Sequence, residues 1–298
     1  MLGDPVWRSM NALSAAEDMK PLLTLLENAP EGWMRETLWR HAATPDVLHR
    51  QLERLDVDFD TVERMIRRMG LAALPALLDA LEVSGDRESA ALVEMIVGIG
   101  PDAGPIVANR MDGARPAQQR LLLSIITKLG VLPEGFDLGA YARHSEPAVR
   151  REAFRAIIRD PAQRDEAIAG ALADPDERIV RLAIGAAMSS CPPKAAAILI
   201  SRADDPTLSA DLRALGIRAA ASSKSPATLE FLMGLTAGKR RFLRRRALAT
   251  ATPEVLAALA GLATHWSNDP AALETLEAAT KSSDKDIRDA VARRASAT

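Results

Sequence analysis

The stretch 148–158 reads AVRREAFRAII, and its pattern returns twice further along the chain. RIVRLAIGAAM follows at 178–188, thirty residues later, and DLRALGIRAAA follows at 211–221, thirty-three residues later. In each copy the aliphatic and alanine side chains fall at the three- and four-residue spacing of one helix face. Each copy is therefore predicted to form an amphipathic helix that turns its apolar face to a core.

A second series places an apolar residue before glycine every thirty residues, at Gly70, Gly100 and Gly130. The first two copies also carry a proline at the same offset, Pro75 and Pro105. Glycine adopts the positive φ that ends many helices, and proline fits the first turn of the next helix. Each unit of the repeat is thus predicted to hold two short helices.

Asp-Pro and Ser-Pro pairs are predicted to supply turns and N-caps between these helices. They are Asp160-Pro161, Asp174-Pro175, Asp205-Pro206 and Ser225-Pro226. Ordering thirty residues costs about 45 kcal/mol, at about 1.5 kcal/mol each, and requires burial of roughly 1,800 Å² of apolar surface. One helical hairpin cannot bury that much, so neighbouring units must stack. The predicted fold is an all-α solenoid, a right-handed superhelix of about seven to nine helical hairpins.

Two recurring patterns resemble bacterial HEAT-type repeats, in the broad group that includes the short phycobilisome-lyase-like units. The first pattern, V-R-x-x-A-x-x-A-[LI], is read as VRREAFRAI at 149–157 and LRALGIRAA at 212–220. The second pattern, L-G-x-x-A-x-P-x-L, is matched at 69–77 and 99–107. The resemblance covers about residues 61–237 and implies the solenoid fold. Such repeats serve many unrelated tasks, so it implies little about function.

The two ends of the chain depart from the thirty-residue spacing. Residues 1–60 carry three of the four tryptophans and eleven acidic against six basic side chains, and are predicted to form an irregular N-terminal cap. Residues 238–298 begin with a basic connector and continue with predicted cap helices, ending in DKDIRDAVARRA, which looks like the start of another unit. The expected organisation is a single solenoid over 1–298, with the regular repeats at 61–237.

Composition limits the class of protein. With 48% apolar and 26% charged residues, and few aromatic ones, the chain is expected to fold around an aliphatic, helix-favouring core. The longest stretch without charge, 255–268, is shorter than the ~20 residues that cross a bilayer, and no signal peptide is recognisable at the start. A single cysteine, Cys191, excludes an internal disulfide and is expected to be a buried side chain. The expected location is the cytoplasm.

No pattern of a catalytic or metal centre stands out. Each of the four histidines is isolated, and the His-Glu pairs of iron-binding HEAT-repeat hydroxylases are missing. These histidines are His41, His49, His144 and His265. Alkylpurine DNA glycosylases, also built from HEAT-like repeats, need an aromatic cradle, whereas residues 61–237 hold one Tyr and no Trp. We therefore expect no enzyme, no metal and no cofactor; a prosthetic-group lyase is suggested only by the resemblance.

The segment GKRRFLRRR at 238–246 concentrates positive charge in a chain whose net charge is −2. Its candidate partner-binding residues are Lys239, Arg240, Arg241, Arg244, Arg245 and Arg246. Three interpretations stay open: a solvated connector, a docking patch for an acidic protein, and contacts with the phosphates of nucleic acid or anionic lipid. The pI of about 6.2 and the lack of interleaved aromatic side chains weigh against nucleic acid.

The predicted function is that of a non-enzymatic, monomeric scaffold that binds protein. In HEAT-like proteins the second helices of the hairpins commonly line a concave face that receives partners. The corresponding stretches here are 72–82, 102–111, 162–173, 193–203 and 226–236. Replacing exposed residues of this face, such as Asp79, Asn109 and Arg202, is expected to change partner binding. The alternative is binding of nucleic acid or another phosphate-rich ligand by the basic residues 239–246.

Overall fold

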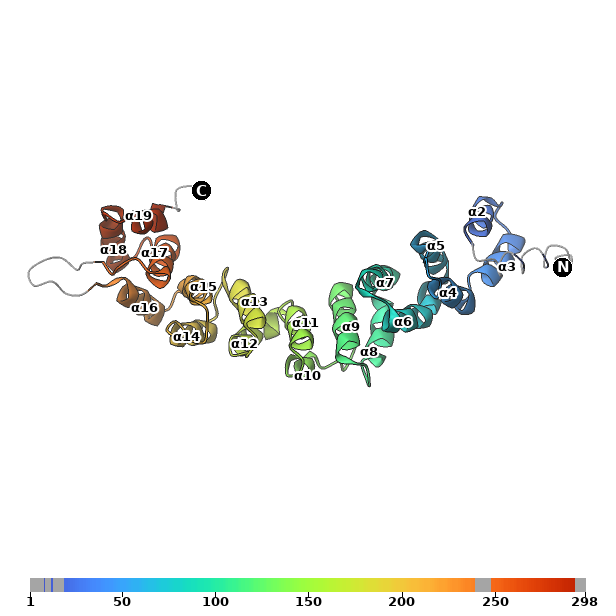
Figure 1. The fold of residues 1–298 in the computed structure, drawn as a ribbon, viewed down its shortest axis with the longest axis horizontal. Coiled ribbons are helices and arrows are strands. Elements are labelled where there is room, and N and C mark those ends of the chain that lie inside the picture. The colour runs from blue at the N-terminus through green and yellow to red at the C-terminus, as the bar shows by residue number, and fades with distance from the viewer. Residues whose placement is uncertain (1–7, 9–11, 13–18, 239–247, 293–298) are drawn as a thin grey trace, which may run out of the picture. The chain divides into compact units, whose positions relative to one another are not determined.

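A computed structural model describes residues 8, 12, 19–238 and 248–292 of the chain. These residues form an all-α protein in which helices pack as sequential neighbouring pairs, as an α-solenoid of helical hairpins does (Figure 1). The predicted fold class is therefore confirmed. Within the described ranges the extended structure is limited to one antiparallel bridge, between Ala237 and Leu248.

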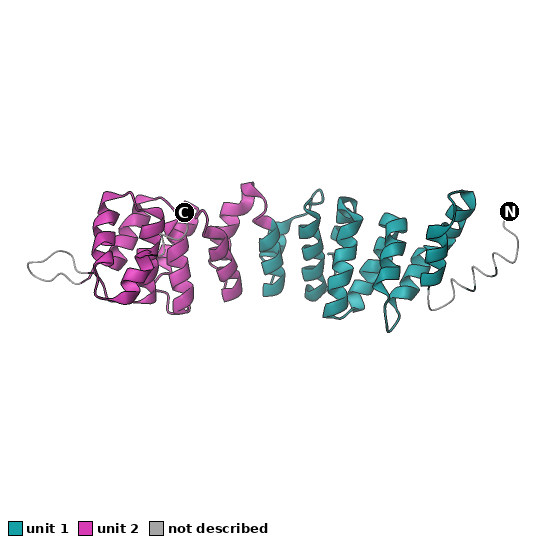
Figure 2. Cartoon of the chain, turned by 90° about the horizontal axis from the view of Figure 1, so that it is seen from above, with its two compact units in different colours: residues 1–156 teal, residues 157–298 magenta. Residues whose placement is uncertain are grey.

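Contacts within the chain define two compact units, 1–156 and 157–298 (Figure 2). The helices of unit 1 are α2 (Lys20–Asn28), α3 (Trp33–Ala42), α4 (Pro45–Leu52), α5 (Phe59–Met69), α6 (Leu74–Val83), α7 (Asp86–Ile99), α8 (Gly104–Asn109), α9 (Pro116–Leu129), α10 (Leu138–Ala142) and α11 (Pro147–Ile157), whose last residue belongs to unit 2. Short 3-10 turns, η1 (Gly70–Ala73) and η2 (Pro101–Ala103), precede α6 and α8. The helices of unit 2 are α12 (Pro161–Ala171), α13 (Glu177–Ala187), α14 (Pro193–Ser201), α15 (Ala210–Ala221), α16 (Pro226–Thr236), α17 (Pro253–His265), α18 (Pro270–Thr280) and α19 (Lys285–Ala292).

Helices two positions apart also pack together, which produces two layers in each unit. In unit 2, α13, α15, α17 and α19 contact one another in turn, and α12, α14, α16 and α18 do the same. In unit 1, α5, α7 and α9 form the corresponding first-helix layer, and α4 packs on α6 in the second-helix layer. Within each unit, neighbouring hairpins thus pack on one another, as the burial argument required.

The helix-ending glycines and the N-cap residues predicted from the sequence are present in the structure. Gly70, Gly100 and Gly130 each end a helix with a positive φ, of 58°, 108° and 74°. Asp160 caps α12 by accepting the backbone N–H of Ala162 at 2.9 Å, with Pro161 in the first turn. Ser225 caps α16 by accepting the backbone N–H of Thr228 at 3.2 Å, with Pro226 in the first turn. The repeat boundaries therefore follow from residues that stop one helix and start the next.

The arginine that follows an aliphatic residue at the start of the repeated helix holds a loop in place. In three copies, Arg150, Arg213 and Arg288, its guanidinium donates to a carbonyl five or six residues earlier, at 2.7 to 2.8 Å. The acceptors lie in the loops before α11, α15 and α19, where carbonyls lack partners in a helix. In the fourth copy the corresponding Arg181 is exposed. The repeated arginine therefore holds the loop against its own hairpin.

Small residues let α15 and α17 approach closely. A Cβ atom on Gly261 would lie 2.5 Å from the Cβ of Ala221, a distance that side chains do not tolerate. The indole N–H of Trp266 donates to the carbonyl of Ala221 at 3.0 Å, which fixes the end of α17 against α15. Residues of α15 and α17 both belong to a buried core cluster rich in alanine and leucine.

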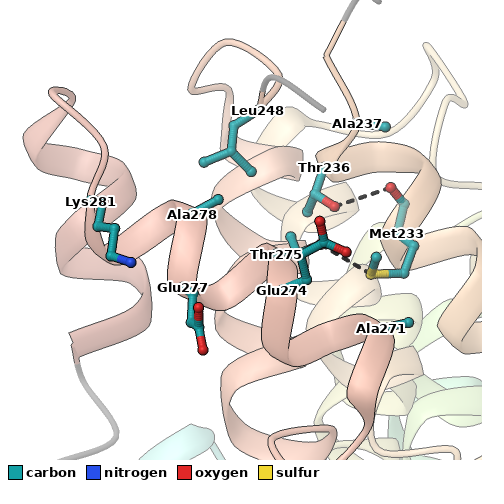
Figure 3. Close-up of a pocket in the computed structure, with 10 residues that line it drawn as sticks. All are labelled: Met233, Thr236, Ala237, Leu248, Ala271, Glu274, Thr275, Glu277, Ala278 and Lys281. Carbon is teal, nitrogen blue, oxygen red and sulfur yellow. Dashed lines mark hydrogen bonds between the residues drawn. The ribbon is translucent and has the colours of Figure 1, made fainter. Parts of the chain in front are cut away.

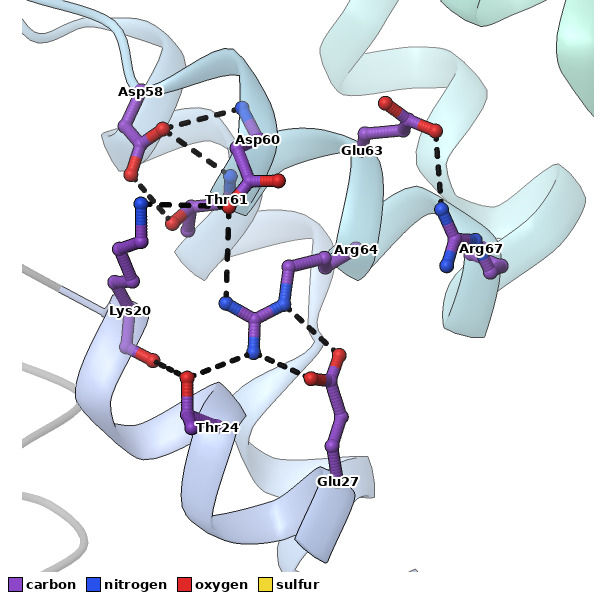
Figure 4. A network of polar contacts seen from close by, with 9 residues as sticks. All are labelled: Lys20, Thr24, Glu27, Asp58, Asp60, Thr61, Glu63, Arg64 and Arg67. Carbon is purple, nitrogen blue, oxygen red and sulfur yellow. Dashed lines mark hydrogen bonds and ion pairs between the residues drawn. The ribbon is translucent and has the colours of Figure 1, made fainter.

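Ion pairs join the first helices of unit 1 (Figure 4). Arg64 on α5 donates to both carboxylate oxygens of Glu27 on α2, from Nε at 2.9 Å and Nη2 at 2.6 Å, and also to the hydroxyl of Thr24. The hydrogen bond from Arg64 lowers the pKa of Glu27. Asp58 caps α5 and accepts the Thr61 hydroxyl at 2.9 Å, which lowers the pKa of Asp58. These contacts have a structural role, since each charge already has its partner.

No single helix among the described residues is long and apolar enough to span a membrane. One pair, Asp86–Ile99 with Pro101–Asn109, meets the length and composition only when taken together, and it is bent by 111°.

Candidate partner-binding grooves

The structure places the five predicted face stretches on α6, α8, α12, α14 and α16, each the second helix of its hairpin in chain order. Lys239, Arg240, Arg241, Arg244, Arg245 and Arg246 lie outside the described residues. Their flanks are described: Ala237 and Leu248 form the antiparallel bridge, and the N–H of Ala249 donates to the Thr236 carbonyl at 3.0 Å. The described residues on either side of the basic segment are thus held together at the end of α16.

A pocket of about 360 Å³ borders this bridge in unit 2 (Figure 3). Its lining residues are Met233, Thr236, Ala237, Leu248, Ala271, Glu274, Thr275, Glu277, Ala278 and Lys281. Thr236 donates to the Met233 carbonyl at 3.1 Å, and the Thr275 hydroxyl contacts the Met233 sulfur at 3.6 Å. Its hydroxyls are therefore engaged within the protein. Its charged groups are of both signs, which favours no single charge on a ligand.

A larger groove, of about 560 Å³, lies between α8 and α10 in unit 1. We call it the α8–α10 groove; its lining residues are Pro105, Ala108, Asn109, Asp112, Pro133, Glu134, Gly135, Phe136, Asp137, Ala140 and Tyr141. The loop before α10 packs closely on α8, since a Cβ on Gly104 would come within 3.5 Å of Pro133. Exposed apolar side chains occur on the same elements, at Ile106, Val131 and Leu132. The groove is thus lined by polar and charged side chains and lies beside exposed apolar ones.

A break in the thirty-residue pattern builds this groove. The position that holds Pro75 and Pro105 in the first two copies holds Gly135 in the third. Gly135 has φ 74°, and the N–H of Phe136 donates to the Pro133 carbonyl at 3.1 Å, so a turn forms where the other copies begin a helix. The second helix of this hairpin, α10, begins after the turn and is short. The hollow between the turn and α8 is the result.

An aromatic pair stands in the groove. Phe136 and Tyr141 stack with their ring centroids 5.4 Å apart and their planes 16° from parallel. Both side chains are partly exposed, so part of each ring is open to solvent in the groove. Tyr141 is the one tyrosine of the chain. The groove therefore gathers aromatic surface that is scarce elsewhere in this sequence.

The charged groups that line the groove are all carboxylates: Asp112, Glu134 and Asp137. Burial raises the pKa of Tyr141, and the charges of Asp112 and Asp137 raise it further. Asp137 also caps α10 by accepting the N–H of Gly139 at 2.8 Å. The guanidinium of Arg143 lies beside Gly139 and does not line the groove. The groove thus carries a negative charge that its own lining does not neutralise.

The three residues proposed as probes of the face have different surroundings. Asn109 lines the α8–α10 groove and is exposed. Asp79 on α6 accepts from Arg110 at 2.6 Å, so it joins α6 to the end of α8. Arg202 donates to the carbonyl of Leu172 and pairs with Asp205 at 3.1 Å. Asn109 therefore tests binding without disturbing the stacking, whereas the other two residues also support the repeats.

Cys191 and the histidines have ordinary structural positions. Cys191 is buried, as expected, and burial raises the pKa of its thiol to about 11, well above that of a reactive thiol. Glu53 pairs with His49, and Nδ1 of His144 accepts the N–H of Glu146. Burial and the charge of Lys224 lower the pKa of His265. Over the described ranges, no three His, Cys, Asp or Glu side chains come together as metal ligands.

The comparisons with known proteins give no family and no activity. No family model matches the chain, and no curated protein matches it. A solved structure that matches is that of an engineered protein, Northeast Structural Genomics Consortium target OR497, at 15% sequence identity and a TM-score of 0.43. The match covers 96% of this chain and 87% of that one.

Proposed function

We propose that this chain is a non-enzymatic helical-repeat scaffold that binds a protein partner through the second-helix layer of unit 1. The observation that carries the proposal is the α8–α10 groove, which combines about 560 Å³ of space with a stacked aromatic pair. Aromatic side chains in a hollow of this kind are typical anchors of protein interfaces. A scaffold function needs no reaction centre.

Kinship with the short HEAT-type repeats is part of the same proposal. The V-R-x-x-A pattern supports it, since its arginine holds the loops of α11, α15 and α19 in place. The helical hairpins and their two layers also support it. In such a protein the second helices are the expected docking surface, and α8 and α10 supply the groove from that layer.

Binding of a phosphate-rich ligand by residues 239–246 is the alternative proposal. Its support is the run of six basic side chains, together with the bridge that joins the flanking residues Ala237 and Leu248. This alternative predicts binding to single-stranded nucleic acid or to anionic lipid vesicles that falls steeply with salt. Replacing the six basic residues by alanine would then abolish binding.

Site-specific photo-crosslinking tests the proposed protein interface. A photoreactive phenylalanine derivative at Ala140, which is exposed and lines the groove, is expected to crosslink a protein from the cells that make this chain. The matched control is the same label at Ala117, which is exposed on α9 in the first-helix layer. The crosslinked protein, once purified, should form a stoichiometric complex with the unlabelled chain.

Three results decide the outcome of the crosslinking. A product that depends on position 140 and is absent at position 117 supports the proposal. Equal products at both positions, or a purified protein that forms no complex, contradict it. Crosslinks to nucleic acid that disappear when residues 239–246 are neutralised favour the alternative.

A further inference from the structure

The chemistry of the α8–α10 groove selects the kind of partner segment that it can hold. The pocket beside Leu248 is lined by charges of both signs, whereas each charge that lines the α8–α10 groove is negative. Asp112 and Glu134 are exposed, and neither forms an ion pair with another residue that the structure describes. Asp137 accepts the N–H of Gly139 with one of its two carboxylate oxygens.

The aromatic pair beside these carboxylates adds a second preference. The face of a tyrosine or phenylalanine ring attracts a cation, and a guanidinium can lie flat against such a ring while its N–H groups reach carboxylates. Phe136 and Tyr141 stack nearly parallel, so each leaves one ring face on the outer side of the pair. Carboxylates and an aromatic face in one hollow together favour an organic cation.

We propose that the α8–α10 groove binds an arginine-bearing, positively charged segment of the partner protein, with a guanidinium against the Phe136–Tyr141 pair and its N–H groups donating to the lining carboxylates. This inference rests on the proposed function, since it takes the groove as the docking site. It adds the chemical class of the bound segment. An arginine fits better than a lysine because its planar guanidinium can donate two parallel hydrogen bonds to one carboxylate.

A metal ion is a poorer occupant of the groove. Metal sites need three or more ligands at short range, and such groups of side chains do not occur in the described part of the chain. The groove volume, about 560 Å³, is also far larger than a cation needs and suits a side chain with its neighbouring backbone. Size and lining chemistry therefore point to the same kind of ligand.

The single tyrosine makes the proposal directly measurable. Biosynthetic incorporation of 3-fluorotyrosine labels Tyr141 alone, so a ¹⁹F spectrum of the full chain reports on the groove with one signal. The probes are three capped pentapeptides, Gly-X-Leu-X-Gly, with X as arginine, lysine or citrulline. Citrulline has nearly the shape of arginine but no charge. Titration near neutral pH and low salt gives the dissociation constants.

The arginine peptide is expected to shift the signal, and the citrulline peptide is expected to bind about tenfold more weakly or not at all. The D112N variant should bind the arginine peptide about two- to fivefold more weakly, as expected for the loss of one exposed ion pair. The matched control is D102N, which removes one exposed carboxylate of the same unit outside the groove. It should leave the dissociation constant unchanged. Added salt should weaken binding of the arginine peptide to the wild-type chain.

Failure of this inference is distinguishable from failure of the proposed function. Equal binding of the arginine and citrulline peptides, or no shift at millimolar peptide, overturns the choice of a cationic segment. Equal effects of D112N and D102N overturn it as well. None of these results changes the crosslinking at position 140, which tests the groove as a protein interface whatever the charge of the partner.

Discussion

The guanidinium of Arg213 on α15 donates to Oε1 of Glu254 on α17 from both Nε, at 3.2 Å, and Nη2, at 3.0 Å. Both side chains are largely buried. Burial opposes the charge of Glu254, but hydrogen bonds from its own backbone, Arg213 and Thr252 outweigh burial and lower its pKa. This pair joins two hairpins of unit 2 that are 41 residues apart in the sequence.

Replacement of Glu254 by glutamine is therefore expected to lower the free energy of unfolding by about 1 to 3 kcal/mol at neutral pH, the usual value of a hydrogen-bonded charge. A group whose pKa is lower in the folded state stabilises the fold above its ordinary pKa and loses that effect as the pH falls. The difference between wild type and E254Q should thus narrow below pH 4.5. Urea titrations across this range measure it. E230Q, at an exposed position on α16, is the control and should change little.

The close approach of α15 and α17 predicts an unusual cost for the smallest possible side chain. G261A is expected to destabilise the protein by about 1 to 3 kcal/mol, because the new methyl group would overlap Ala221. G234A on α16 meets no atom within 4 Å and should stabilise by about 0.5 to 1 kcal/mol through helix propensity. Thermal melts compare the two variants. A stabilised G261A would contradict the packing described here.

The Arg64–Glu27 pair predicts which arginine of α5 holds α2 in place. R64A is expected to destabilise the contact between α2 and α5 by about 1 to 2 kcal/mol, since its side chain is 12% exposed and makes several hydrogen bonds. R67A, whose side chain is 73% exposed and pairs within its own helix, should cost under about 0.5 kcal/mol. Hydrogen exchange of the α2 amides measures both. Equal exchange in the two variants would refute the assignment.

Titration of Tyr141 tests the geometry of the groove without any partner. Because it is the one tyrosine, the absorbance of the phenolate should report its ionisation alone. Its midpoint is expected above the ordinary pKa of 10.0, owing to burial and then to Asp112 and Asp137. D112N should lower the midpoint, whereas D102N should leave it in place. Circular dichroism at each pH establishes that the fold is intact, and a midpoint insensitive to D112N would place this carboxylate away from the ring.

The architecture could be predicted from the sequence because its signals are local and repeated. Gly70, Gly100 and Gly130 end helices by the φ that glycine alone adopts easily, and Asp160 caps the helix that follows it. Such residues act on their immediate neighbours, so the pattern of one unit is enough. The covering of each apolar face by the next hairpin then follows from burial.

The candidate site could not be predicted in the same way, because it arises where the repeat is broken. Gly135 replaces the expected proline and produces a turn, which brings Phe136 and Tyr141 together opposite α8. The departure from the pattern and the rare tyrosine were the available signals. The sequence drew attention to residues 239–246 instead, because charge is visible in a sequence whereas the surroundings of a side chain are not. The role of that segment stays a prediction.

Hydrogen exchange of the chain with and without its crosslinked partner tests the central claim most directly. If the partner docks in the α8–α10 groove, the amides of 104–112 and 133–142 should exchange more slowly in the complex. Those of α13 in unit 2 should keep their free rates. Protection limited to unit 2, or no protection of either groove segment in a stoichiometric complex, would contradict the account.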